Sequence, residues 1–123
     1  GGKERAKAFA KEFGLEFIAL QKKRDRKTGK VQIKTKNATE VNGRDLILVD
    51  DMISTGGSII NATQFLKKQK CKKVYVACTH ALLMNNAEKK IRKAGVTKIV
   101  SANTIPGKTS VVDVSNTIAK AII

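Results

Sequence analysis

Apolar residues recur along the chain at two spacings, and together they predict alternating helices and strands. Over residues 3–13, Phe9 and Phe13 fall about one helical turn apart, and Gly14 is suited to end the helix. The same spacing predicts three further helices, over residues 59–70, 86–93 and 115–123. Ser115 is expected to cap the last of these helices.

Continuous apolar runs between these helices predict strands. The run Leu-Ile-Leu-Val at 46–49 is typical of a strand buried on both faces of a parallel sheet. Further strands are expected at 15–20, 74–79, 98–102 and 111–112. This alternation predicts an α/β fold, a three-layer sandwich with a parallel sheet between helices. In such folds, ligands bind at the carboxyl ends of the strands.

Composition narrows the class of protein. With 123 residues, 41% of them apolar, the chain can form one domain with one core. Lys and Arg number 25 against 10 Asp and Glu, so the net charge of +15 favours anionic partners such as phosphates or nucleotides. No apolar run approaches the roughly 20 residues of a spanning helix, so no membrane partner is expected. Cys71 and Cys78 follow no zinc or secreted-disulfide pattern, which favours a cytoplasmic location.

A basic segment separates the first predicted strand from the second. Residues 21–36 hold eight Lys or Arg and a single acid, Asp25. The Thr-Gly pair at 28–29 predicts a turn, so we expect a long exposed loop or ribbon that is mobile without ATP. An isolated basic run is usually a solvated loop, and the lack of aromatic residues between Phe17 and Phe65 argues against a nucleic-acid-binding platform.

The most informative stretch joins the 46–49 strand to the next helix. Residues 54–58 read Ser-Thr-Gly-Gly-Ser, and the glycines allow positive φ and close approach of the backbone to a ligand. Free N–H groups and the dipole at a helix start favour a phosphate, and Thr55 and Ser58 add hydroxyl donors. The Gly-Lys-Ser/Thr ending of a Walker A loop is missing. From the residues alone, a plain strand-to-helix turn with an Asp cap is the alternative.

Two adjacent carboxylates, Asp50 and Asp51, directly follow the strand. They would be unexpected beside a phosphate alone, but they can accept hydrogen bonds from sugar hydroxyls or hold Mg²⁺ through water. His80, the single histidine, follows a predicted strand. A metal or base role is one alternative for His80, and a hydrogen-bonded structural role is the one we favour. No residue is assigned as a certain metal ligand.

Residues 47–58 resemble the ribose-5-phosphate/PRPP-binding signature of type I phosphoribosyltransferases, in which two Asp precede Thr-Gly-Gly-Thr/Ser. More narrowly, the chain resembles the C-terminal domain of the ribose-phosphate pyrophosphokinase (PRPP synthetase) family. Four further segments carry this resemblance: Gly1-Gly2-x-x-Arg5-Ala6, Lys22-Lys23-Arg24, Ala77-Cys78-Thr79-His80-Ala81 and Asn103-Thr104-Ile105-Pro106. The resemblance implies a single phosphoribosyltransferase-like domain over residues 1–123, the C-terminal half of a longer enzyme.

The resemblance also implies a reaction. The anomeric hydroxyl of ribose 5-phosphate takes a diphosphoryl group from ATP, giving PRPP and AMP, with Mg²⁺ as cofactor. The 5-phosphate is then expected on five residues: Ser54, Thr55, Gly56, Gly57 and Ser58. Asp50 and Asp51 would hold the ribose hydroxyls, and Lys22 and Arg24 would be catalytic, closing over the ATP phosphates. Many family members have Asp where Ser54 stands, which leaves the role of that side chain open.

Parts of the family's site are missing from this chain. Gly1 and Gly2 are the remnant of a pyrophosphate loop whose Asp, a metal ligand in the family, is absent. The family's N-terminal domain, which supplies most of the adenine site, is absent too. We therefore expect this chain to bind ribose 5-phosphate or PRPP but to make no PRPP alone. The full-length protein is expected to form a homo-oligomer with shared ATP sites.

Three alternatives are kept. A phosphoribosyltransferase that consumes PRPP would share the 50–58 stretch, but no segment is found for the hood that should cover its base. A non-catalytic, PRPP-synthetase-like regulatory protein is disfavoured by the retained basic and acidic candidate residues. Nucleic-acid binding driven by net charge would be non-specific, weak and steeply salt-dependent.

Overall fold

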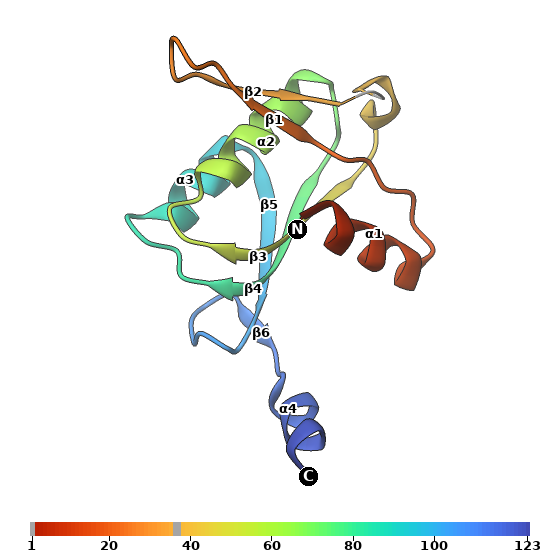
Figure 1. Cartoon of the computed structure of the whole chain (residues 1–123), viewed down its shortest axis with the longest axis vertical. Coiled ribbons are helices and arrows are strands. Elements are labelled where there is room, and N and C mark those ends of the chain that lie inside the picture. Colours follow the sequence, from red (N-terminus) through yellow and green to blue (C-terminus); the bar gives the residue numbers. More distant parts are fainter. Residues whose placement is uncertain (1, 36–37) are drawn as a thin grey trace.

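Four parallel strands form the central sheet of the computed structural model, which describes residues 2–35 and 38–123 (Figure 1). The strands lie side by side in chain order: β3 (Leu46–Ile53), β4 (Val74–Ala81), β5 (Val96–Ala102) and β6 (Ser110–Val112). The predicted α/β class and parallel sheet are confirmed. Two residues named in the sequence predictions, Gly1 and Lys36, lie outside the described residues.

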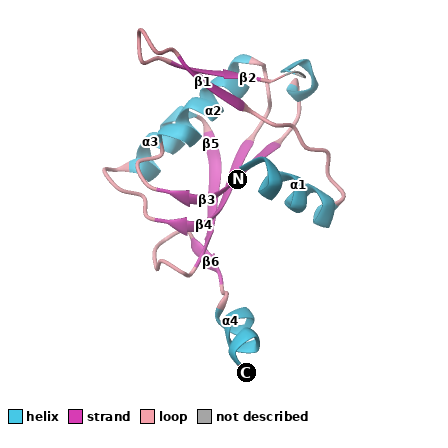
Figure 2. Ribbon diagram, in the orientation of Figure 1, coloured by secondary structure: helices cyan, strands magenta, loops and turns pink. Residues whose placement is uncertain are grey.

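Helices flank this sheet at the predicted positions (Figure 2). The described helices are α1 (Gly2–Phe13), the short 3₁₀ helix η1 (Ala38–Val41), α2 (Gly57–Lys68), α3 (Ala87–Ala94) and α4 (Ser115–Ile122). Helices α2 and α3 pack on each other, α1 lies against β3, and α4 projects away from the rest of the chain (Figure 1).

The N-cap prediction at Ser115 is wrong. Val114 precedes the first helical residue of α4, and no side chain caps that helix from the N-cap position. The Ser115 N–H instead donates to Oδ1 of Asp113 over 2.8 Å. A carboxylate two residues upstream therefore takes the role that the sequence assigned to the Ser115 hydroxyl.

The core lies between the sheet and the α2–α3 pair. On β4, Val74, Val76 and Cys78 alternate with the less buried Tyr75 and Ala77, so one face of the strand is sealed and the other is half-buried. On β3, Ile47 is 44% exposed, and the expectation of a strand buried on both faces is wrong. Among the described residues β3 pairs with β4 alone, which makes β3 an edge strand.

The predicted strand at 15–20 is also wrong. The segment has no regular secondary structure, although Ile18 and Leu20 pack against the core. Strand geometry is stabilised by a hydrogen-bonded neighbour, and within the described part of the chain this segment joins no ladder. Instead, a cavity of about 720 Å³ is lined by both this segment and β3.

The basic segment forms an antiparallel ribbon beside α2 (Figure 2). Its strands are β1 (Gln21–Arg24) and β2 (Val31–Lys34), and we call residues 21–34 the basic ribbon. Backbone pairing runs from Gln21 with Lys34 to Arg24 with Val31. The basic segment was predicted to be an exposed loop or ribbon, and it forms a ribbon.

Candidate functional site

The 54–58 loop connects the end of β3 to the start of α2, as the sequence predicted. Three main-chain bonds from the 82–84 segment fix its position: Leu82 N and Leu83 N donate to Ile53 O over 3.0 and 3.1 Å, and Met84 N donates to Ser54 O over 2.8 Å. The loop is therefore held by hydrogen bonds from the segment that follows β4, in addition to its covalent connections to β3 and α2.

Gly56 is required at the N-cap of α2 for two reasons. Its φ of +83° is a left-handed conformation, which side chains rarely adopt. A Cβ at this position would also lie 2.9 Å from Cδ1 of Ile91, a buried residue of α3. Of the two glycines that would allow positive φ, only Gly56 adopts it, and Gly57 is the first residue of α2.

The start of α2 presents main-chain donors toward the loop. The Ile60 N–H donates to Gly56 O over 2.9 Å, so the N–H groups of residues 57–59 precede the first bond within the helix. Together with the positive end of the helix dipole, these groups make the loop a place where an anion is stabilised.

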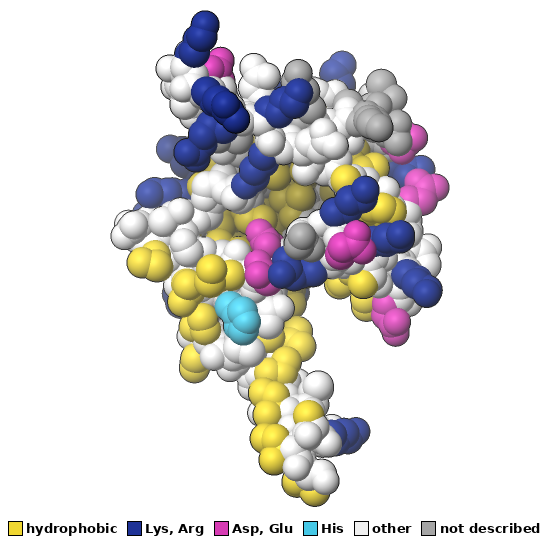
Figure 3. All heavy atoms as spheres, viewed as in Figure 1, with side chains coloured by type: hydrophobic (Ala, Val, Ile, Leu, Met, Phe, Trp, Pro, Cys, Tyr) yellow, Lys and Arg dark blue, Asp and Glu magenta, His cyan; other side chains and the backbone are white. Residues whose placement is uncertain are grey.

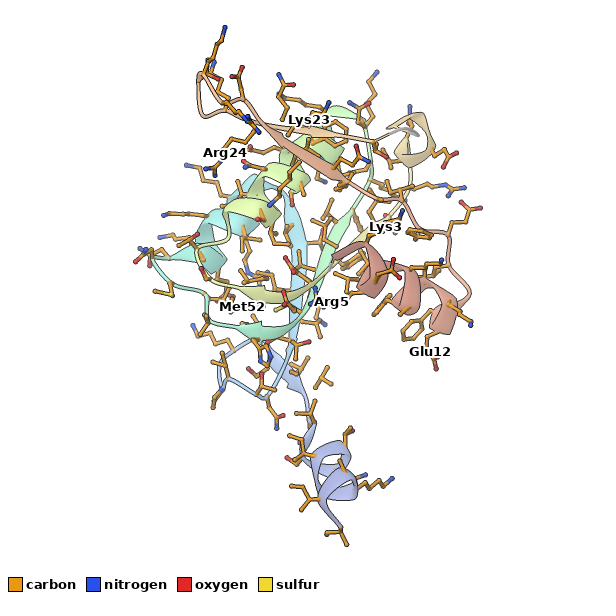
Figure 4. The ribbon with its side chains drawn as sticks, in the orientation of Figure 1. Lys3, Arg5, Glu12, Lys23, Arg24 and Met52 are labelled. Atoms are coloured by element: carbon orange, nitrogen blue, oxygen red, sulfur yellow. The ribbon has the colours of Figure 1, made fainter. Side chains whose placement is uncertain are left out.

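Asp50 and Asp51 lie within β3, which continues to Ile53, four residues beyond the predicted strand. Because successive strand residues point to opposite faces, the two carboxylates face different surroundings. Asp50 lines the cavity beside the 54–58 loop. Asp51 meets α1, where Arg5 Nη2 donates to its Oδ2 over 3.0 Å (Figure 4).

The two carboxylates also differ in acidity. Burial is the main cause that raises the pKa of Asp50 above its ordinary value. The hydrogen bond with Asp50 is the main cause that lowers the pKa of Asp51, and the charge of Arg5 lowers it further. The Asp51 N–H also donates to Asp50 Oδ1 over 2.8 Å. The pair is therefore electrostatically asymmetric.

The basic ribbon closes one side of the cavity. Lys22 and Arg24 are two residues apart on β1, so both lie on the face of the strand that lines the cavity, while Lys23 points the other way. The Lys22 ammonium donates a hydrogen bond to Oγ of Ser58. Basic side chains gather along this ribbon in the space-filling view (Figure 3), and Figure 4 labels Lys23 and Arg24 on it.

One cavity of about 470 Å³ thus collects most of the predicted residues. It is lined by Lys22, Arg24, Asp50 and all of residues 54–58. Asp51 is adjacent in sequence but turned toward α1. Gly2, also a predicted site residue, lies at the start of α1 and lines the second cavity with residues 15–20.

His80 lies at the carboxyl-terminal end of β4, and its ring is held by a short chain of hydrogen bonds. Thr104 Oγ1 donates its single proton to Thr79 O over 3.0 Å, so His80 Nδ1 must be the donor in its 2.8 Å contact with Thr104 Oγ1. A hydrogen-bonded histidine was the favoured prediction. Among the described residues, no cluster of three or more His, Cys, Asp or Glu could hold a metal ion.

Two features of the site were missed from the sequence. Asn61, on α2, lines the cavity, and Arg5 pairs with Asp51 across 46 residues of chain. Arg5 belonged to a segment of family resemblance but had no assigned contact. The helical spacing that predicted α1 gave no indication of where that helix packs.

The other chemically reactive candidates are not part of this cavity. Cys71 and Cys78 are buried free thiols, and the run of apolar residues around Cys78 predicts its burial. Burial, with a smaller contribution from the Asp50 charge, raises the pKa of Cys78 to about 11.

In the part of the chain that the structure describes, no helix has the length and apolar character to cross a bilayer.

Two relatives are similar to the chain over nearly all of its length. Ribose-phosphate pyrophosphokinases from Sulfurisphaera tokodaii and Methanopyrus kandleri are 43% and 38% identical to it, and each match covers 99% of this chain. The chain spans 43% and 41% of the length of those two proteins.

Two solved structures share its fold. Phosphoribosylpyrophosphate synthetase from Mycobacterium smegmatis superposes with a TM-score of 0.78 at 26% identity, over 97% of this chain and 40% of that one. Adenine phosphoribosyl transferase from Trypanosoma brucei matches with a TM-score of 0.57 at 17% identity, over 93% of this chain and 61% of that one, a likeness of fold alone.

The family model described as "Phosphoribosyl synthetase-associated domain" matches residues 4–123. The match therefore includes the basic ribbon, both carboxylates and the 54–58 loop, and it confirms the family that the sequence resemblance indicated. The chain belongs to the phosphoribosyl synthetase-associated domain family.

Proposed function

We propose that this chain is the ribose-5-phosphate-binding part of a ribose-phosphate pyrophosphokinase. In the complete enzyme, the anomeric hydroxyl of ribose 5-phosphate would attack the β-phosphorus of ATP, and the diphosphoryl group would move to give PRPP and AMP. The observation that carries the proposal is the shared cavity, in which cations of the basic ribbon face the 54–58 loop and Asp50.

The 54–58 loop is assigned to the 5-phosphate. Main-chain N–H groups at the start of α2 supply several donors without a bulky side chain, and Thr55 and Ser58 add hydroxyls at the same place. Gly56 adopts the left-handed conformation from which α2 begins at this place. Lys22, which contacts Ser58, would meet the bound phosphate as well.

Asp50 and Asp51 are assigned to the ribose. A carboxylate accepts hydrogen bonds from vicinal hydroxyls, and the half-buried Asp50 is the member of the pair that faces the cavity. Asp51 would take part only after the exposed ion pair with Arg5 rearranges. Exposed ion pairs are weak because water screens both charges, so the rearrangement costs little.

Lys22 and Arg24 are assigned to the transferring group. Phosphoryl transfer depends mainly on alignment and on neutralising the charge that develops on the phosphate oxygens. Two cations on one face of a short strand can approach those oxygens together, and a ribbon that covers the cavity also limits access of water.

Mg²⁺ fits the donors of this site. Mg²⁺ is usually bound by one or two carboxylates together with substrate phosphates and water, and Asp50 offers its carboxylate oxygens beside the proposed phosphate site. Asp51 would add a second carboxylate only after its ion pair with Arg5 rearranges. The ion would supply charge neutralisation for the phosphates when bound. Because no larger acidic cluster exists among the described residues, its remaining ligands would come from substrate, water or chain outside this sequence.

We further propose that residues 1–123 act as one domain within a longer enzyme, consistent with a chain that spans less than half of its relatives. Homo-oligomerisation and a cytoplasmic location belong to the same proposal. The N-terminal portion of the relatives would supply most of the adenine site and the missing metal-binding Asp.

Calorimetric titration of this chain with ribose 5-phosphate tests the assignment of the phosphate. Thr55→Val removes a hydroxyl that the ligand would cover, and the affinity should fall by on the order of 1–3 kcal/mol. Thr117→Val, on the exposed surface of α4, is the matched control and should leave the affinity unchanged. Equal affinities for wild type and Thr55→Val would contradict the proposal.

A further inference from the structure

The turn of the basic ribbon is organised around one side chain, Asp25. Its Oδ1 accepts hydrogen bonds from the N–H groups of Lys27 and Thr28, over 2.7 and 3.3 Å. Two main-chain bonds of 2.8 Å close the same turn, from Asp25 N to Lys30 O and from Gly29 N to Asp25 O. Gly29 completes the turn with a φ of +69°.

This turn matters because the ribbon has few other sources of stability. Each strand has only four residues, and all of β1 is exposed. An isolated two-stranded ribbon is marginally stable in water. The Asp25 carboxylate accepts hydrogen bonds from two N–H groups of the turn, and contributions of this size determine whether so short a ribbon forms.

The turn also determines which side chains reach the cavity. Arg24, next to Asp25, pairs with Val31, and Lys22 pairs with Ile33. Because side chains alternate along a strand, a slip of one residue would turn both cations away from the 54–58 loop. Holding the turn therefore holds Lys22 and Arg24 on the cavity side.

We propose that Asp25 is a positioning residue: by closing the turn, it keeps the basic ribbon in the register that directs Lys22 and Arg24 at the cavity. The inference rests on the proposed function, since it assigns Asp25 a role in the turnover that those two cations promote. Asp25 acts through hydrogen-bond acceptance, and its negative charge is not required.

The test separates these two properties of Asp25 in the complete enzyme. Asp25→Ala removes the acceptor and the charge, and kcat should fall about fivefold, the effect of losing one capping side chain, with a much smaller change in the KM for ribose 5-phosphate. Asp25→Asn keeps Oδ1 and should restore kcat, because Asn and Asp are comparable acceptors in such turns. Gly29→Ala strains the same turn without touching any charge and should act like Asp25→Ala.

Amide hydrogen exchange supplies a readout that does not depend on turnover. Exchange at the β1 and β2 amides should accelerate in Asp25→Ala and Gly29→Ala, while Asp25→Asn and α2 stay at the wild-type rate. Unchanged kcat and exchange in Asp25→Ala, while Arg24→Ala slows turnover, would overturn the inference and leave the proposed function standing. An Asp25→Asn variant as slow as Asp25→Ala would also overturn it, because charge would then be the active property. Wild-type turnover in Arg24→Ala would overturn both.

Discussion

The 54–58 loop and the basic ribbon face each other across one cavity, but different forces hold them in place. The loop is tied to the 82–84 segment by main-chain bonds, and its Gly56 is packed against buried Ile91. The basic ribbon is exposed and is held mainly by its own pairing and its Asp25 turn. In the proposed function, a loop held by packing would receive ribose 5-phosphate, and an exposed ribbon beside it would close over the ATP phosphates and exclude water.

A substitution that disturbs the packing of the 54–58 loop should destabilise the fold. Gly56→Ala would force a side chain into a left-handed conformation and against Ile91, so we expect a loss of about 2–5 kcal/mol in the free energy of unfolding. Gly43→Ala is the matched control, because Gly43 has a similar φ of +72° but open space around its Cβ position. Urea denaturation measures both, and equal losses would mean that contact with Ile91 is unimportant.

Substitutions on the cavity side of the basic ribbon should lower kcat and leave the free energy of unfolding unchanged. In the complete enzyme, Lys22→Ala or Arg24→Ala should lower kcat by about a hundredfold, the scale for losing one group that stabilises transition-state charge. Binding of ribose 5-phosphate should change far less. Lys23→Ala, on the opposite face of β1, is the control and should keep kcat near wild type. Turnover within twofold of wild type for both cavity-facing variants would refute the catalytic assignment.

The smallest expected effects concern the two carboxylates. The pKa of Asp50 is raised in the folded chain, so its ionised form destabilises the fold, and Asp50→Asn should raise the free energy of unfolding at pH 7. The pKa of Asp51 is lowered, so its ionised form stabilises the fold, and Asp51→Asn should lower that free energy.

The difference for Asp50→Asn should shrink first, as the pH falls through the raised pKa of Asp50 toward the ordinary Asp value of about 3.9. The difference for Asp51→Asn should persist to lower pH, because its pKa is the lower one. Denaturation curves of the three proteins between pH 7 and pH 3 measure this. Changes of the same sign for both variants would mean that the pair is not asymmetric.

Local patterns predicted most of the fold, and long-range contacts account for what was missed. Helical spacing located α1, α2 and α3, and the Gly-Gly turn located the 54–58 loop, because both signals lie within a few consecutive residues. The 15–20 run has strand composition, yet whether it forms a strand depends on a neighbour that local sequence does not specify. The exposure of Ile47 has the same origin, since it depends on β3 lying at the edge of the sheet.

The candidate site divides in the same way. Asp50 and the 54–58 loop were found from residue type and spacing, whereas Lys22 and Arg24 were found from the family resemblance, and all of them share the cavity. The separation of Asp50 from Asp51 follows from strand alternation, but it required knowing that β3 runs on to Ile53. The Arg5–Asp51 pair joins residues 46 positions apart, and no local pattern indicates such a contact.

The edge position of β3 has a consequence for how the chain behaves at high concentration. An unpaired strand edge offers free main-chain groups to another copy of the same strand, and uncharged apolar strands are the most prone to such association. In Leu46–Ile53 the only charged residues are Asp50 and Asp51. The carboxylates proposed to hold the sugar therefore also give this strand two like charges, which we expect to oppose the pairing of one β3 with another.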